Sequence, residues 1–155
     1  EDGIRDIGVT GVQTCALPIS LGFSLAYQGF AEELAEFPGK YAPPRGGLLL
    51  ARVGGVAAGT VALRALAPDI CEMKRLYVKP SFRGVRTASG LSLGRALAQG
   101  IVDVGRVGGY RRLRLDTISD KMGAAVKLYR AMGFVDIAPY YDSPVPGTAY
   151  MGLVL

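Results

Sequence analysis

Histidine is missing from this 155-residue chain, and cysteine occurs only twice. Without histidine, the sequence excludes a metal site or charge-relay system built on that residue, and it lacks the usual general base near neutral pH. Two cysteines are too few for a disulfide framework. No apolar run approaches the roughly 20 residues of a membrane-spanning helix. Half of the residues are nonetheless hydrophobic, which predicts one domain with a sizeable core.

The net charge of +5 comes from basic residues that are scattered along the chain. Such a charge is compatible with a nucleic-acid partner. The lysines and arginines are not clustered with aromatic residues, however, so an anionic cofactor accounts for the charge equally well. We therefore expect no nucleic-acid partner, no membrane partner and a cytoplasmic location.

Residues 1–19 do not fit the pattern of the rest of the chain. The segment has no hydrophobic period and no cationic region ahead of an apolar stretch, so it is not a signal peptide. Two stretches of it, EDGIRD and VTGVQTCALPI, read codon by codon as a translated sequencing adapter. A genuine disordered leader is the alternative. We expect residues 1–19 to form no part of the working fold, the natural protein to start upstream of about Ser20, and Cys71 to be the only native cysteine.

The segment from Cys71 to Gly105 combines a strand, a loop rich in Gly, Ser and Arg, and a helix. Residues with high β-propensity run up to Pro80, which ends the strand. Apolar residues then recur at helical spacing and predict a helix over 93–107, with Ser92 as its N-cap. A helix N-terminus after such a loop presents unpaired N–H groups and a positive dipole end, which suit a pyrophosphate. A plain connection whose glycines only permit a tight turn is the alternative.

Elements are also predicted on both sides of this segment. In chain order, we expect a helical region over 20–37, a hairpin of strands 48–53 and 56–63 around Gly54-Gly55, a strand over 110–116, a helix ending at Met132, and strands over 134–137 and 149–155. Ser119 or Asp120 is expected to cap the second helix, with Gly133 after its end. Lys40 and Tyr41 are expected to be exposed or to line a pocket. The mixture predicts an α/β fold with a mostly antiparallel sheet.

The strings RLYVKPSFRG and LGRAL resemble the acetyl-CoA-binding core of the GNAT acetyltransferase superfamily. GYRRLRLDT and AAVKLYRAMGF continue the resemblance, which covers most of the chain from Ser20 onward. It implies that residues 20–155 form a GNAT-like domain, with a mixed, mostly antiparallel sheet that is flanked by helices and lacks the first strand. The implied activity is direct transfer of an acetyl group from acetyl-CoA, the co-substrate, to a primary amine of a small molecule or peptide, without a metal. A homodimer is left open, and a non-catalytic or decayed acyl-CoA-binding domain is the alternative function.

The phosphate loop departs from the family pattern in its length. In the family it reads Arg/Gln-x-x-Gly-x-Gly/Ala and leads straight into the helix. Here roughly six extra residues, 86–91, separate Arg83 from the helix start. Ser92 then stands where the family has its central glycine, unless Gly90 folds back into that role. We expect the extra residues to hinder phosphate capture modestly, because a longer loop costs more entropy to order.

The resemblance also implies a cofactor site and an acid. The implied cofactor-binding residues are Leu76, Tyr77, Val78, Arg83, Gly84, Ser92, Leu93, Gly94 and Arg95. Tyr129 occupies the position of the tyrosine that protonates the departing thiolate, and a phenol with an ordinary pKa of about 10 suits that task. The alternative interpretation is that Tyr129 only packs on the apolar face of its helix.

A base and an acceptor region complete the expected site. Glu72 is a candidate base for the amine, directly or through water, and a solvated glutamate near Lys74 and Arg75 is the rival interpretation. The residues expected on the acceptor side are Tyr140, Tyr141 and Asp142. Asp142 could hold a cationic amine there, although a simple polar turn explains these three residues nearly as well.

Overall fold

A seven-stranded sheet runs through the molecule in the order β1-β2-β3-β4-β5-β7-β6. The structure, a computed structural model, describes residues 4–5, 35–36 and 38–155. The strands are β1 (Ile4–Arg5), β2 (Gly47–Val53), β3 (Val56–Ala67), β4 (Ile70–Val78), β5 (Arg112–Ile118), β6 (Val135–Asp136) and β7 (Thr148–Val154). Neighbouring strands are antiparallel except β4 and β5, which are parallel. The predicted mixed, mostly antiparallel sheet is confirmed.

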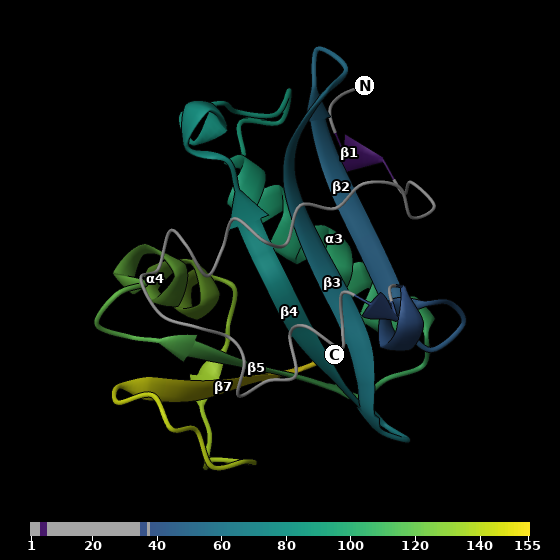
Figure 1. Cartoon of the computed structure of the whole chain (residues 1–155), viewed down its shortest axis with the longest axis vertical. Helices are drawn as coiled ribbons and strands as arrows, with labels where there is room; N and C mark the ends of the chain where they lie inside the picture. The colour runs from purple at the N-terminus through teal and green to yellow at the C-terminus, as the bar shows by residue number, and fades with distance from the viewer. Residues whose placement is uncertain (1–3, 6–34, 37) are drawn as a thin grey trace.

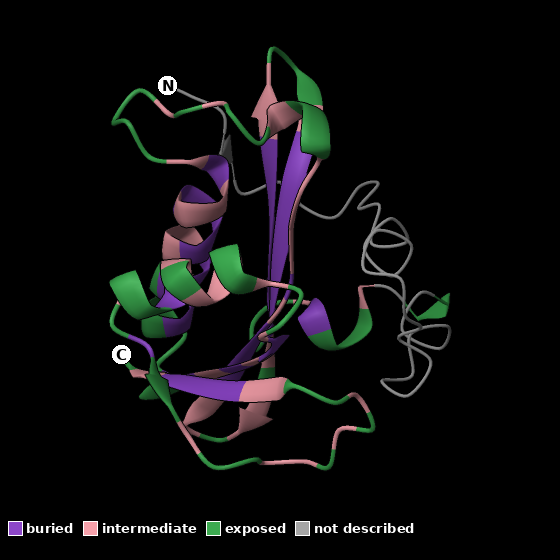
Figure 2. Ribbon diagram, turned by 90° about the vertical axis from the view of Figure 1, so that its left-hand side faces the viewer, coloured by how far each residue is buried: buried purple, intermediate pink, exposed green. Residues whose placement is uncertain are grey.

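The helices α3 (Leu93–Val107) and α4 (Gly123–Ala131) lie on the same face of this sheet (Figure 2). Leu97 and Ile101 of α3 are fully buried against the strands β2, β3 and β4, behind which α3 lies in Figure 1. Two 3₁₀ helices, η2 (Gly39–Tyr41) and η3 (Pro80–Phe82), lie between the larger elements. Among the described residues, no helix combines the length and apolar character that crossing a bilayer requires.

Most element boundaries match the sequence prediction. The helix over 93–107 is confirmed, and the Ser92 Oγ accepts a hydrogen bond from the Arg95 N–H at 3.2 Å, as an N-cap should. The β2–β3 hairpin turns at Gly54 and Gly55, whose φ angles of 56° and 81° favour glycine. β5 starts later than expected because Tyr110 still belongs to the helix end, where its N–H donates to the Gly105 carbonyl.

The structure corrects two expectations about individual side chains, one of them in part. Neither Ser119 nor Asp120 caps α4, which starts at Gly123 without a side-chain cap. The Ser119 Oγ instead donates to the Gly147 carbonyl at 3.0 Å, so the hydroxyl is bonded to a distant loop and not to the start of the helix. For Tyr41, the exposed alternative was wrong, because the residue is 1% exposed and packs against Leu48 of β2.

The edge of the sheet next to β2 carries the short strand β1. Ile4 pairs with Ala51 and Arg5 with Leu50 in an antiparallel ladder. The other residues of the 1–19 segment lie outside the described residues, as do residues 20–34 of the expected helical region. The expectation that residues 1–19 form no part of the working fold therefore stays a prediction.

β4 and β5 are paired at one end and separate at the other. Their register holds only Ile70 opposite Arg112, Cys71 opposite Leu113 and Glu72 opposite Arg114, although both strands continue beyond these pairs. Figure 1 shows β5 and β7 turning away from β4. β4 also contains an irregularity at Arg75, whose φ is 59°, where its register with β3 shifts. The sheet therefore opens as a wedge between the second halves of β4 and β5.

Candidate active site

A cavity of about 510 Å³ lies where β4 and β5 separate. The predicted site residues that line it are Leu76, Tyr77, Val78, Arg83, Ser92, Leu93, Gly94 and Tyr129. The start of α4 and the residues before it, including Lys121, complete the lining. The structure thus brings the end of β4, the loop, the start of α3 and Tyr129 around one cavity. Gly84 and Arg95 are the two predicted cofactor residues that do not line it.

The β4 edge of this cavity carries main-chain groups that are not paired with β5. On one side β4 pairs with β3, where Tyr77 lies opposite Thr60 and Val78 opposite Gly59. On the other side its register with β5 ends at Glu72. Backbone polar groups need partners, so the free edge of β4 is suited to hydrogen bonding a ligand that enters the wedge.

The start of α3 supplies the second main-chain surface. The first N–H groups of a helix have no intrahelical partner, and the Ser92 hydroxyl satisfies only that of Arg95. Leu93 and Gly94, the next residues, both line the cavity. A Cβ at Gly94 would be 3.9 Å from Leu128 and 4.0 Å from Val78, so the glycine leaves the cavity wall open. An anion in this cavity would meet free N–H groups and the positive end of the helix dipole.

The extra residues in the phosphate loop form a small hairpin of their own. Arg86 and Ser92 form an antiparallel bridge at its base, and the Thr87 N–H donates to the Leu91 carbonyl at 2.8 Å. Gly90 lies in its turn, with a φ of 84°, and its N–H donates to the Thr87 carbonyl. Gly90 therefore does not take the place of the missing central glycine. Because the hairpin ends meet, Arg83 and Ser92 still line the same cavity despite the insertion.

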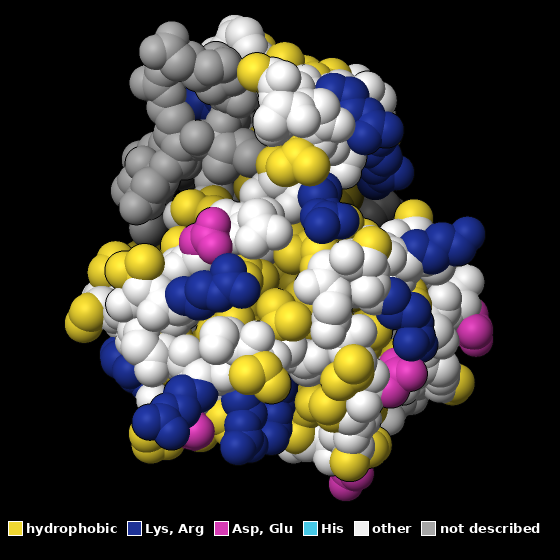
Figure 3. Space-filling view, turned by 180° about the vertical axis from the view of Figure 1, so that it is seen from behind, with side chains coloured by type: hydrophobic (Ala, Val, Ile, Leu, Met, Phe, Trp, Pro, Cys, Tyr) yellow, Lys and Arg dark blue, Asp and Glu magenta, His cyan; other side chains and the backbone are white. Residues whose placement is uncertain are grey.

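Arg83 is held at the mouth of the cavity. Its Nε donates to the Val78 carbonyl at 3.1 Å, and its guanidinium lies 5.9 Å from the centre of the Tyr77 ring. The remaining guanidinium nitrogens can donate to an anion, since guanidinium binds phosphate oxygens well. Figure 3 shows other Lys and Arg side chains scattered over the face that carries the helices, without the continuous basic stripe typical of a nucleic-acid-binding face.

Tyr129 lies in the core and also lines the cavity. Its ring is 5% exposed and packs against Phe134, with ring centres 5.6 Å apart, and the residue also lines the cavity. Burial, and to a lesser extent the negative charge of Asp116, raises the pKa of the Tyr129 phenol above its ordinary value. The phenol therefore stays protonated near neutral pH, as a proton donor must.

Glu72 is buried, so the interpretation of a solvated glutamate was wrong. Its side chain is 1% exposed, and its carboxylate accepts hydrogen bonds from the Arg64 Nε at 2.7 Å and the Tyr140 hydroxyl at 2.6 Å. Burial alone would raise the pKa of Glu72, but Lys74, Tyr140 and Arg64 outweigh it and hold the pKa below its usual value. The carboxylate is thus ionised and a weak base.

Glu72 belongs to a polar network that spans the wedge. The Lys74 Nζ lies 3.9 Å from the Glu72 Oε1 and 3.8 Å from the Asp116 Oδ1, which joins β4 to β5. The Tyr141 hydroxyl donates to the Asp116 Oδ2 at 2.8 Å. Tyr140 and Tyr141 therefore do more than form a polar turn, because their hydroxyls reach the two carboxylates of the wedge. Asp142 is exposed.

Sequence reasoning missed Lys74 and Asp116 as members of the site. Both alternate with core residues on their strands, since Met73 and Leu115 are buried, and that alternation was the available signal. Burial lowers the pKa of Lys74 despite the neighbouring carboxylates of Glu72 and Asp116.

Comparisons with known proteins give consistent results. Residues 21–134 match the family described as the acetyltransferase (GNAT) family. An uncharacterized N-acetyltransferase of Schizosaccharomyces pombe is 42% identical over 134 residues, which cover 85% of this chain and 78% of that protein. A GNAT-family acetyltransferase from Staphylococcus aureus has a similar structure, with a TM-score of 0.75, 18% identity, and coverage of 96% of this chain and 97% of that one. A Bacillus subtilis acetyltransferase in complex with CoA has a TM-score of 0.68 at 19% identity, covering 100% and 99% of the two chains.

Proposed function

Because the chain belongs to the acetyltransferase (GNAT) family, we propose that it transfers the acetyl group of acetyl-CoA directly to a primary amine of a small molecule or peptide. The cavity of about 510 Å³ carries this proposal, because strand edge, loop, helix start and Tyr129 all border it. The CoA bound to the Bacillus subtilis acetyltransferase of the same fold supports CoA as the carrier.

In this proposal, acetyl-CoA lies in the wedge with its pyrophosphate at the start of α3. The N–H groups of Leu93 and Gly94 and the guanidinium of Arg83 bind the phosphates, with Ser92 shaping the helix start. Gly84 and Arg95 contribute indirectly, Gly84 as part of the loop and Arg95 by holding Ser92 at the helix start through its N–H. The main chain of Leu76, Tyr77 and Val78 binds the pantetheine and acetyl groups, and its N–H groups polarise the thioester carbonyl.

The reaction moves one acetyl group and two protons. The amine nitrogen attacks the carbonyl carbon, the C–N bond forms, and the C–S bond breaks as the thiolate leaves. Tyr129 gives its phenolic proton to the thiolate sulfur, and the phenolate then recovers a proton from solvent. The attacking nitrogen loses its extra proton to Glu72, directly or through water. Because the pKa of Glu72 is lowered, the carboxylate then passes this proton on to solvent readily and returns to its ionised form.

The acceptor approaches from the side of the sheet that carries the polar network. Tyr140 and Tyr141 lie there because their hydroxyls bind Glu72 and Asp116. Asp142 lies next to them in the chain and is exposed, so we assign it to the outer rim of the acceptor side. The phenol of Tyr140 stays protonated, since burial and the charge of Glu72 raise its pKa.

Gly94→Glu tests the proposed cofactor site. The wall at Gly94 is open, so the new side chain extends into the cavity and its charge repels phosphates. Calorimetry with acetyl-CoA should show no binding to this variant, with an unchanged circular dichroism spectrum. Gln99→Glu is the matched control, because it adds the same charge on α3 away from the cavity, and it should bind normally. Unchanged affinity of Gly94→Glu would show that acetyl-CoA does not bind in this cavity. If the wild-type chain binds acetyl-CoA but releases no CoA with any amine, a non-catalytic acyl-CoA-binding domain is favoured.

A further inference from the structure

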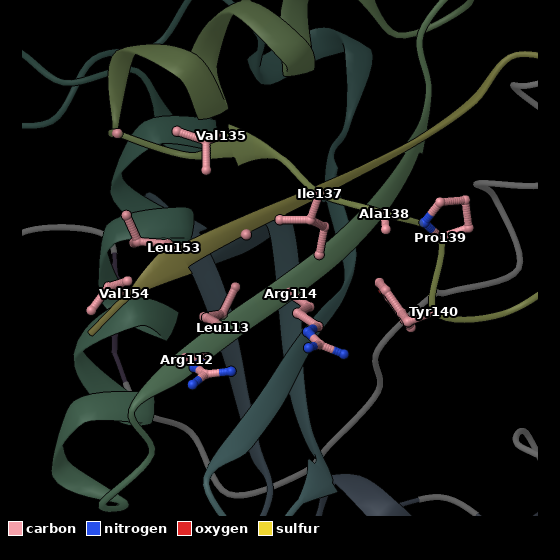
Figure 4. A pocket seen from close by; sticks show the side chains of 12 residues that line it. Arg112, Leu113, Arg114, Val135, Ile137, Ala138, Pro139, Tyr140, Leu153 and Val154 are labelled. Atoms are coloured by element: carbon pink, nitrogen blue, oxygen red, sulfur yellow. The ribbon is translucent and has the colours of Figure 1, made fainter.

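A second cavity, of about 520 Å³, lies at the paired end of β5, away from the wedge. β5, β7 and the segment around β6 line it, and Figure 4 shows Arg112 and Arg114 on one side of it with Ile137, Ala138 and Pro139 across from them. Along β5, the two arginines alternate with Leu113 and Leu115, which are buried in the core. We call this second cavity the β5–β7 groove.

The two arginines of the β5–β7 groove have no acidic partner among the described residues. Arg112 is exposed, and Arg114 is half-buried with its guanidinium 5.5 Å from the centre of the Tyr140 ring. The nearby carboxylate of Glu72 is already bound by Arg64 and Tyr140. Two positive charges therefore face the groove, and a negatively charged ligand group would satisfy both.

The rest of the groove is apolar. Val135 and Val154 are 61% and 79% exposed, which is unusual for large apolar side chains of the described residues. Gly152 forms the floor, where a Cβ would lie 3.1 Å from the Ile137 Cγ2 and would press that side chain into the groove. Such a concave apolar surface with a few convergent polar groups is typical of a small-molecule site, and its volume falls within the usual range.

We propose that the β5–β7 groove binds a small organic acid, with its carboxylate between Arg112 and Arg114 and its apolar body against Ile137 and the floor at Gly152. Tyr140 lines the groove and also donates a hydrogen bond to Glu72, so it connects a ligand here with the wedge. Two sources share this chemistry: the carboxylate of an amino-acid-like acceptor, and a separate acid that regulates the enzyme. Binding to the groove does not depend on acetyl transfer. Only the choice between the two sources rests on the proposed function.

Calorimetric titration of the full chain with sodium octanoate, without acetyl-CoA, tests the site. We expect one saturable site with at least tenfold weaker affinity for octan-1-ol, which lacks the charge. The double variant Arg112→Gln/Arg114→Gln should lose at least tenfold in octanoate affinity. Arg111→Gln is the matched control, because it removes one neighbouring charge outside the groove and should bind normally. Equal affinities for the acid and the alcohol, or an unchanged double variant, would overturn the proposal.

A second variant separates loss of the site from loss of the fold. Val135→Phe should fill the groove from an exposed position and weaken octanoate binding, whereas Val56→Phe on the β2–β3 hairpin should not. Equal binding by both phenylalanine variants would place octanoate elsewhere and refute the groove. In turnover assays, competition between octanoate and the amine would show that the groove binds the carboxylate of the acceptor. A change of kcat without a change of KM would show that it binds a separate, regulatory acid.

Discussion

Replacing Tyr129 with phenylalanine removes one oxygen atom and leaves the packing of the ring in place. The ring is 5% exposed and contacts Phe134 in the core, so the phenylalanine ring can occupy the same space. Among the described residues, the Tyr129 hydroxyl has no hydrogen-bond partner that the change would leave unsatisfied, so the usual penalty of about 1–3 kcal/mol should not apply. The melting temperature should therefore barely move.

The catalytic cost of the same change should be large. A positioned general acid contributes typically about 10²–10⁴ in rate, so kcat should fall by that factor, or roughly 3–5 kcal/mol in activation free energy. The affinity for acetyl-CoA should stay the same, because the hydroxyl is needed for the leaving thiolate and not for binding the phosphates. The kcat of the wild-type enzyme should not fall through deprotonation of Tyr129 up to about pH 10, since its raised pKa keeps the phenol protonated there.

The assay follows release of the free CoA thiol with a screen of primary amines, and calorimetry measures acetyl-CoA affinity in parallel. Tyr77→Phe is a matched control, because Tyr77 also lines the cavity and loses the same atom. Full activity in Tyr129→Phe would refute the assignment and leave water as the proton source. A fall in both kcat and melting temperature would instead support a purely structural hydroxyl.

Three other predictions concern the network, the loop and the chain start. Because the folded-state pKa of Glu72 is lowered, its ionised form stabilises the fold above the ordinary glutamate pKa of about 4.3, and this stability is lost as the pH falls through the folded-state pKa. Glu72→Gln should abolish that part of the pH dependence of stability in denaturant titrations at different pH values. An unchanged pH dependence would contradict the argument. Deleting residues 86–91 should tighten acetyl-CoA binding by no more than about threefold, since halving a loop saves only ~0.6 kcal/mol, and weaker binding would show that the hairpin contacts the cofactor. A chain that starts at Ser20 should melt no lower than the full chain, and a drop of several degrees, equivalent to ~1 kcal/mol, would show that β1 contributes to the fold.

The parts of the fold that depend on local patterns could be predicted from the sequence. α3 has a regular apolar stripe and a serine cap, and the β2–β3 hairpin has a Gly-Gly turn, so neighbouring residues alone determine both. The cap of α4 was predicted wrongly because Gly147, far along the chain, competes for the Ser119 hydroxyl. A local sequence pattern does not show a hydrogen-bond partner that lies far along the chain.

The candidate site likewise has a part that local sequence predicts and a part that depends on distant residues. Most predicted residues that line the cavity at the start of α3 belong to one stretch of the sequence, 76–94, so a local motif was enough to group them. The burial of Glu72 depends on Arg64 from β3 and on Tyr140, which is 68 positions away in the chain. The β5–β7 groove likewise arises only when β7 pairs beside β5 and brings Gly152 next to Arg114. These contacts are products of strand order, which a motif does not specify.

The hairpin over residues 86–91 has a practical consequence for protein engineering. Its two ends meet at the Arg86–Ser92 bridge, and its hydrogen bonds otherwise join residues within 86–91. Exposed loop tips of this kind tolerate insertions best. A short peptide tag, or a cysteine for a fluorescent dye, could therefore be introduced at Ser89 without altering the strands and helices. The flanking residues Arg83 and Ser92 both line the cavity, so the label would be attached to the loop that borders it.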